Sequence, residues 1–186
     1  MKISNLIEIQ KLIIKSNLEN VKTAIDATLG NGKDTITIRE TFGKKVKIYA
    51  FDIQKDAIER SKRNIPVEYH ENIEFIQDSH EFIDKYVEEK VQLVMFNLGY
   101  LPKSDHVVKT NPYTTLHALE RALEMLDVGG LISIMFYVGH DNAREYNSLL
   151  EYIRILDAKK YKAIHINPIN QYEYAPKMAI IQKLED

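Results

Sequence analysis

The sequence has no cysteine among its 186 residues, which excludes disulfide bonds and thiolate metal sites. Long hydrophobic segments are also missing. The longest apolar runs have the length of a strand, whereas a membrane-spanning helix needs about 18 such residues. The first residues do not form the apolar core and cleavage site of a signal peptide. We therefore expect a cytoplasmic protein that does not enter a membrane.

An excess of positive charge is lacking as well, since the formal net charge is −2. The overall field of the molecule does not favour nucleic acid, so any RNA binding would depend on a local basic patch. The 6 histidines show neither the H-E-x-x-H motif nor another clustered ligand spacing. We expect no metal.

Strand-like apolar runs alternate with helical patterns along the chain. We predict strands at 21–28, 46–52, 73–76, 91–97, 131–137, 161–167 and 178–182. Helices are expected at 34–42, 55–64, 82–87, 143–156 and from Pro112, capped by Asn111, to a stop at Gly129-Gly130. This order predicts an α/β fold: a mostly parallel seven-stranded sheet with helices on both faces and an antiparallel C-terminal strand. One domain spans 1–186, with an amphipathic helix in 1–18 (Leu6, Ile9, Leu12, Ile13) and the core at 21–186.

The most informative motif is an apolar run that ends in Asp26-x-x-x-Gly30-x-Gly32. Twenty residues later a second apolar run ends at Asp52. Glycines let the backbone approach a bound nucleoside, and the carboxylate accepts hydrogen bonds from ribose hydroxyls. This form of the motif indicates S-adenosylmethionine (SAM) rather than a dinucleotide, because Thr35 takes the place of the third glycine. The alternative is an ordinary strand, turn and helix with incidental glycines.

Polar residues recur where predicted strands end, namely at Asp26, Asp52, Asp78 and Asn97. Ligands of parallel α/β sheets bind at the carboxyl ends of the strands, so these side chains are expected to share one edge. Asp78 would accept from an adenine amino group, unless it only caps the following helix.

The fourth strand leads into Asn97-Leu98-Gly99-Tyr100-Leu101-Pro102. This segment resembles the Asn/Asp-Pro-Pro-Tyr loop of methyltransferases that act on amino nitrogens, with Leu98-Gly99 in place of the two prolines. The likeness implies that the Asn97 amide and the Leu98 carbonyl accept the hydrogens of the amine, while Tyr100 stacks on the base. A plain turn after a strand is the alternative.

Several segments together resemble one bacterial family of class I methyltransferases, the rRNA methylases. They are 26–35, 51–54, 78–81, 96–102 with Asp105, 137–140 and 169–171. Members are associated with methylation of 5-aminomethyl-2-thiouridine at the tRNA wobble position. The resemblance implies a Rossmann-like fold and SAM as cofactor. This sequence departs from the family pattern at Lys103-Ser104, where two glycines are usual, and at Ala175, where proline is usual.

Motif and resemblance together give the predicted site. The cofactor-binding residues are Asp26, Thr28, Gly30, Asn31, Gly32, Asp34, Thr35, Asp52, Ile53, Gln54, Asp78, Ser79, His80 and Asn97. The substrate-binding residues are Leu98, Tyr100, Lys103, Asp105, His106, Lys109, Tyr137, His140, Arg144, Asn170 and Gln171.

An alkylamine is largely protonated at neutral pH, so the enzyme must remove a proton or bind the minor neutral form. We assign Asp105 to orient and deprotonate the amine, with His106 or His140 as other candidate bases. Asn97, Asp105 and His140 form the predicted catalytic set.

The expected partner is tRNA at its anticodon stem-loop, contacted through Lys103, Lys109, Arg144 and Lys177. A homodimer could use the N-terminal helix. Two other functions stay open: methylation of rRNA or a small amine, and a non-catalytic SAM- or RNA-binding module.

Overall fold

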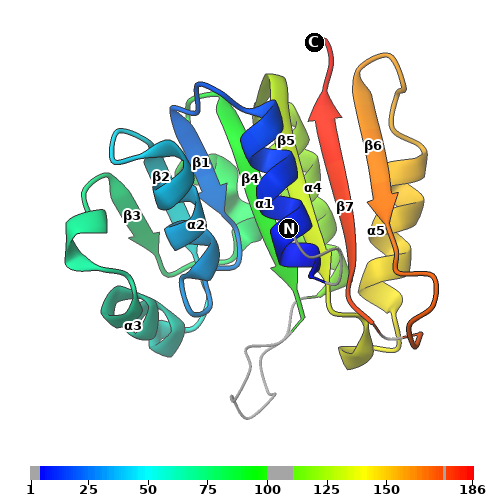
Figure 1. Ribbon diagram of the computed structural model, residues 1–186, viewed down its shortest axis with the longest axis horizontal. Coiled ribbons are helices and arrows are strands. Elements are labelled where there is room, and N and C mark those ends of the chain that lie inside the picture. The colour runs from blue at the N-terminus through cyan, green and yellow to red at the C-terminus, as the bar shows by residue number, and fades with distance from the viewer. Residues whose placement is uncertain (1–4, 100–110, 174) are drawn as a thin grey trace.

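Seven strands form a single sheet in the order β3-β2-β1-β4-β5-β7-β6. The computed structural model describes residues 5–99, 111–173 and 175–186 (Figure 1). The strands are β1 Thr23–Asp26, β2 Lys47–Phe51, β3 Ile73–Ile76, β4 Val91–Leu98, β5 Leu126–Phe136, β6 Tyr161–Ile166 and β7 Lys177–Lys183. The helices are α1 Leu6–Asn17, α2 Lys33–Phe42, α3 Lys55–Asn64, α4 Pro112–Met125 and α5 Arg144–Arg154, with 3₁₀ turns η1 Val67–Tyr69, η2 His80–Lys85 and η3 Val138–His140.

All adjacent strands from β3 to β5 pair in parallel, and β7 runs antiparallel to both of its neighbours. The predicted mostly parallel sheet with one antiparallel C-terminal strand is therefore confirmed. The chain has the class I, Rossmann-like methyltransferase fold. Because β1, β2, β4 and β5 run the same way, their carboxyl ends meet along the lower edge in Figure 1.

Helices cover both faces of the sheet, with α1 and α2 in front and α4 and α5 behind (Figure 1). Successive residues of β4 serve the two layers in turn. Leu93 packs with Ile14 of α1 in the front core, and Val94 packs with Leu119 of α4 in the rear core. This alternation is the period of two that a pleated strand imposes.

Helix α4 begins as predicted, with the Asn111 side chain accepting from the Tyr113 N–H and Pro112 in the first turn. Its predicted end was wrong. The helix stops at Met125, and Gly129-Gly130 lie inside β5. Leu126 is fully buried and pairs with Val91, so the strand begins before the glycines. The register shift between Val91 and Leu93 accommodates them, because glycine tolerates such an irregularity.

Two other local predictions were corrected. The helix expected at 82–87 is the 3₁₀ segment η2, which starts at His80 and is interrupted at Phe82. In α1, Leu12 is 48% exposed, although the sequence placed it on the apolar stripe. The buried positions of this helix are Gln10 and Ile14. Gln10 can be buried because its side chain donates to Ser133 Oγ of β5 at 2.8 Å. A satisfied polar group can therefore face the sheet there.

Within the described residues, no helix combines the length and the apolar character required to cross a bilayer.

Candidate active site at the carboxyl ends of the strands

The turn after β1 is organised by the carboxylate of Asp26, which is fully buried. One oxygen accepts from the Thr28 N–H at 3.2 Å. The other accepts from the N–H and the hydroxyl of Thr35, at 3.1 and 2.7 Å. Asp26 and Thr35, both predicted to bind the cofactor, thus face inward and fix the shape of the glycine turn.

Gly32 brings α2 close to the end of α3. Its φ is +80°, and a Cβ at this position would lie 2.8 Å from Cδ1 of Ile65. Both facts demand glycine. Gly30 also has a positive φ, of 50°. The turn therefore presents backbone rather than side chains to the edge of the sheet, as an approaching nucleoside requires.

Asp52, at the end of β2, binds the same turn. Its two carboxylate oxygens accept from the N–H groups of Gly30 and Gln54, each at 2.9 Å. Burial raises its pKa, and the two backbone donors oppose that rise. The next side chain, Ile53, is 51% exposed. A half-buried carboxylate beside an exposed apolar side chain suits a ribose and its purine ring.

The third strand contributes Asp78, which is half-buried. It accepts from the Ser79 N–H at 2.7 Å and from the Tyr86 hydroxyl at 2.7 Å. The cap of η2 is Ser79, whose hydroxyl accepts from the Glu81 N–H, so Asp78 is not the helix cap. The His80 ring turns inward, with Nδ1 donating to the Ala27 carbonyl at 3.1 Å. Burial lowers the pKa of His80, so the ring is neutral at pH 7.

Asn97, at the end of β4, is held at both its backbone and its side chain. Its N–H donates to the Thr28 hydroxyl at 2.7 Å, and its amide nitrogen donates to a carboxylate oxygen of Asp34. Asp34 is 9% exposed. Burial, followed by the nearby charge of Asp26, raises its pKa to about 7. Burial likewise raises the pKa of Asp26 to about 6.

The Leu98 carbonyl is less open than predicted, because it already accepts from the Tyr137 N–H at 3.0 Å. An amine hydrogen would have to use its second lone pair. Gly99 lies against the Tyr137 ring: a Cβ there would be 3.1 Å from the Tyr137 Cβ. Burial, and then the charge of Asp34, raises the pKa of Tyr137. The Tyr137 phenol is therefore close enough to Asp34 to respond to its charge.

Part of the predicted substrate site lies outside the described residues, namely Tyr100, Lys103, Asp105, His106 and Lys109. The backbone of His140 belongs to η3, at the same edge as Asn97. Asn31 belongs to the glycine turn, and its carbonyl accepts from the Asn64 side chain at 3.2 Å.

Three more substrate candidates are exposed on this edge, but farther from Asp52. Arg144 begins α5, while Asn170 and Gln171 lie between β6 and β7. Lys177 was wrongly predicted to contact phosphate. It is buried, with its ammonium group donating to the Glu173 and Ala175 carbonyls at 2.6 and 3.3 Å.

Ala175, which stands where the family pattern usually has proline, makes a backbone hydrogen bond. Its N–H donates to the Tyr172 carbonyl at 2.9 Å, a bond that proline could not make.

A buried polar pair next to the site escaped the sequence analysis. Glu145 is 1% exposed and accepts from the Thr115 hydroxyl at 2.7 Å. The only available signal was a carboxylate in the first turn of an amphipathic helix, which is common on surfaces. Glu145 borders a small hollow beside the end of β4, which is also lined by Leu98, Phe136, Tyr137, Val138, Asp141 and Tyr146.

No cluster of three or more metal-ligating side chains occurs in the part of the chain that the structure describes.

These features fit SAM. Asp52 would accept from the ribose hydroxyls, Ile53 would cover the adenine, and the turn through Gly30 and Gly32 would approach the ligand with its backbone.

Comparison with known proteins identifies the family. The family model described as "Putative rRNA methylase" matches residues 48–182, well over half of the chain. The chain belongs to this methylase family.

Two crystal structures agree with the assignment. One is of a "putative rRNA-methylase" from Clostridium thermocellum, with 35% identity, a TM-score of 0.94 and coverage of 99% of this chain and 100% of the other. The second is of a "putative methyltransferase" from Streptococcus mutans in complex with S-adenosylhomocysteine (SAH). It has 36% identity and a TM-score of 0.88, and the match covers 98% of this chain and 100% of the other. Fold and family together make this methylase a SAM-dependent methyltransferase.

A curated relative in Arabidopsis thaliana is named a chloroplastic tRNA (mnm(5)s(2)U34)-methyltransferase. The two are 35% identical over 155 residues, which is 77% of this methylase and 57% of the plant protein. The methylase thus spans little more than half the length of this curated relative.

Proposed function

We propose that this methylase transfers the methyl group of SAM to the amino nitrogen of the 5-aminomethyl group on the wobble (2-thio)uridine of tRNA. The observation that carries the proposal is the position of Asn97. Asn97 lies at the end of β4, on the same edge as Asp52 at the end of β2, and its backbone N–H and its side-chain amide are each held by one hydrogen bond, to Thr28 and to Asp34. The name of the plant relative supports tRNA as substrate.

When bound, SAM supplies an electrophilic methyl group on a sulfonium. The amine nitrogen forms the new N–C bond while the C–S bond breaks and its electron pair stays on sulfur. The proton that the ammonium form carries passes to a base, for which Asp105 remains our candidate and His106 and His140 the alternatives. Asn97 would accept an N–H of the amine through Oδ1, which aims the lone pair along the S–C axis. Such positioning supplies much of the acceleration in a displacement of this kind.

A second substrate class deserves a test, because the family description refers to rRNA and the plant relative is much longer than this chain. In that case the same site would methylate an amine or a base nitrogen of rRNA.

The deciding experiment supplies labelled SAM together with tRNA, or with rRNA, from cells that lack the modification, and then analyses nucleosides by mass. We expect a methylaminomethyl product from tRNA alone. Asn97→Ala should abolish it, whereas Asn147→Ala, an exposed change on α5, should not. If only rRNA were labelled, rRNA and not tRNA would be the substrate. Label in neither RNA, with SAH still bound, would reject transfer to RNA and leave a small amine or a non-catalytic binding role.

We place the anticodon stem-loop against the edge that carries Arg144, Asn170 and Gln171, all of which are exposed there. Arg144→Glu should weaken tRNA binding and make it less sensitive to salt, because a phosphate contact releases counterions. If neither the tRNA affinity nor its salt dependence changed, Arg144 would not belong to the interface.

We further propose that the reaction takes place in the cytoplasm.

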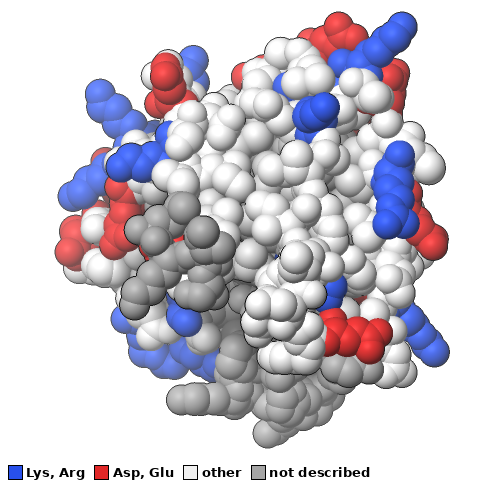
Figure 2. Space-filling model, turned by 45° about the vertical axis from the view of Figure 1, so that its right-hand side comes forward, with Lys and Arg blue, Asp and Glu red and all other residues white. Residues whose placement is uncertain are grey.

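We also propose a homodimer through the front of α1, β6 and β7. Figure 2 shows a broad face without Lys, Arg, Asp or Glu, with charged side chains around its margin. Its residues include Ile164, 45% exposed on β6, and the partly buried Leu6, Ile9, Ile13 and Ile166. An uncharged face is complementary to itself, as a two-fold interface requires. Ile164→Glu should convert a dimer to a monomer in sedimentation; a monomeric parent would end the proposal.

A further inference from the structure

The contact between Asp34 and Asn97 joins a buried acid to the amide proposed to meet the substrate. Asp34 lies in the first turn of α2, and Asn97 lies at the end of β4. The Asn97 amide nitrogen donates to Oδ2 of Asp34. Because the amide group is planar, Oδ1 then points away from Asp34.

We infer that Asp34 is a positioning residue that decides which end of the Asn97 amide faces the acceptor amine. This inference rests on the proposed function. A carboxylate can only accept, so it holds the amide nitrogen and leaves the oxygen for the amine hydrogens. A protonated Asp34 can instead donate to Oδ1. The amide would then turn and present its nitrogen, which cannot accept from an amine.

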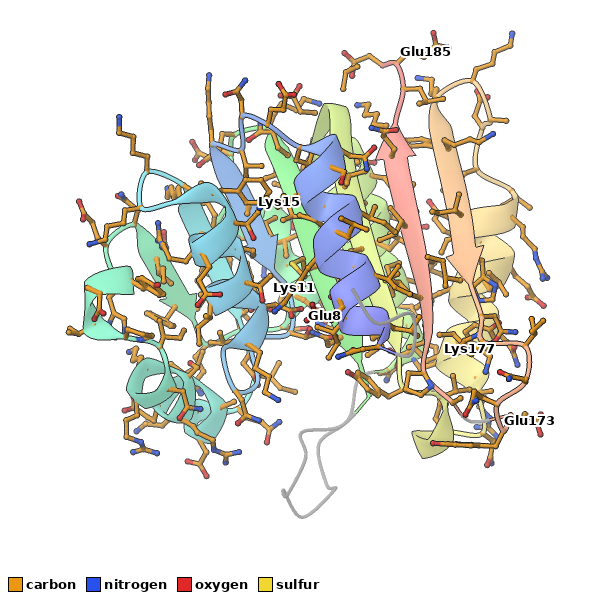
Figure 3. The ribbon with its side chains drawn as sticks, viewed as in Figure 1. Glu8, Lys11, Lys15, Glu173, Lys177 and Glu185 are labelled. Atoms are coloured by element: carbon orange, nitrogen blue, oxygen red, sulfur yellow. The ribbon has the colours of Figure 1, made fainter. Side chains whose placement is uncertain are left out.

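The surroundings of Asp34 place this change in the working range of pH. Asp26 of β1 faces it with like charge, whereas Lys33 of α2 and Lys11 of α1 oppose that effect. The phenol of Tyr137 is also close enough to respond to its charge. Figure 3 shows Lys11 on the flank of α1 that faces α2, together with Glu8, 3.9 Å from Lys11. The balance of these groups and burial raises the pKa of Asp34 to about 7.

Asp34→Asn is the informative variant. Its amide carries an acceptor and a donor, as a protonated carboxyl does, but it does not titrate, so the orientation of Asn97 no longer changes with pH. Asp56→Asn is the matched control, since Lys55-Asp56 opens α3 as Lys33-Asp34 opens α2 and Asp56 is exposed.

The first readout needs neither RNA nor turnover. In the complex with SAH, the ¹³C signal of the Asp34 carboxyl and the ¹⁵N signal of the Asn97 side-chain amide are followed from pH 5 to pH 9. We expect both to titrate together, and the Asn97 signal to stay constant in Asp34→Asn. An Asn97 signal that ignores the titration of Asp34 would overturn the inference.

The second readout is the pH dependence of kcat on tRNA below pH 7. Asp34 must lose its proton in the parent, so log kcat should rise with pH with a slope that is steeper by about 1 than in Asp34→Asn. In Asp56→Asn the slope should match the parent. Equal slopes in parent and Asp34→Asn would contradict the switch. Coupled NMR titrations without methyl transfer to tRNA would support the Asp34–Asn97 coupling while rejecting the proposed substrate.

Discussion

The backbone N–H of Gly30 donates to Oδ2 of Asp52 at 2.9 Å, which joins the glycine turn after β1 to the end of β2. The second oxygen of Asp52 is fixed by the Gln54 N–H. The carboxylate proposed to hold the ribose is thus oriented before the ligand arrives. Preorganisation of this kind favours binding, because less ordering remains to be done in the complex.

Asp52→Ala should therefore weaken SAH binding by about 100-fold, the value of roughly two hydrogen bonds to a charged group. Calorimetric titration with SAH measures the effect. Asp56→Ala, at an exposed site in the next helix, is the control and should bind as the parent does. If Asp52→Ala bound SAH within threefold of the parent, Asp52 would not be a ribose ligand.

Thr28→Val should lower kcat more than it lowers cofactor affinity. The Thr28 hydroxyl accepts from the backbone N–H of Asn97 at 2.7 Å, and valine keeps the shape without the acceptor. We expect a loss of about 1–2 kcal/mol in the free energy of unfolding, from the unsatisfied donor. Transfer should slow by about 10-fold as Asn97 loses its position. Thr28→Ser, which keeps the acceptor, should stay close to the parent in both; an equal loss in Thr28→Ser would show that the hydroxyl acceptor alone does not position Asn97.

Gly32→Ala and Gly43→Ala separate two costs. Gly32 is left-handed, with φ +80° and ψ 14°, whereas Gly43 has φ +82° and ψ −176°, and a Cβ at Gly43 meets nothing within 4 Å. Gly43→Ala should therefore lose only a backbone cost, of roughly 1–3 kcal/mol, because that conformation is almost confined to glycine. Gly32→Ala should lose about 1 kcal/mol for its left-handed backbone and roughly 1–3 kcal/mol more because its Cβ would overlap Ile65. Urea unfolding measures both. Because Ile65 is buried, Ile65→Ala has a cost of its own, and a double-mutant cycle is needed. Ile65→Ala should cost less in the Gly32→Ala background than in the parent; additive losses would point to strain in the turn itself.

Asp34→Asn should stabilise the protein most above pH 7. In the folded state Asp34 keeps its proton up to about pH 7, whereas an unperturbed carboxyl loses it near 3.8. The folded state binds more protons between these values, so the free energy of unfolding falls as pH rises through that window and is level above it. Removing the titrating group should raise the free energy of unfolding by roughly 4 kcal/mol at pH 8 and by less than half of that at pH 5. Thermal unfolding at both pH values tests this, and an equal gain at both would exclude the titration of Asp34 as its source.

Much of the fold was readable because its signals are local. The exact bounds of α3 and β3 and the start of α4 followed from helical spacing, strand length and the pair Asn111-Pro112. The end of α4 was not readable. Whether the chain leaves the helix at Leu126 or at Gly129 depends on the core into which Leu126 packs, and that core comes from distant segments.

The same division holds for the site. The sequence alone determined that Asp26, Asp52, Asp78 and Asn97 end strands, and the rule that parallel strands share a carboxyl edge placed them together. Only the tertiary structure decided which of their neighbours face the ligand and which face the core. Thr35 and Lys177 look available in sequence, yet both are buried.

Asp34 and Asn97 are 63 residues apart, and nothing local in either predicts their hydrogen bond. The sequence thus determined the fold, the family and the edge that bears the chemistry, because these follow from short-range periodicity and motif spacing. The tertiary structure decided the orientation and protonation of each polar side chain, because burial and electrostatic interaction depend on residues that meet only in the folded protein.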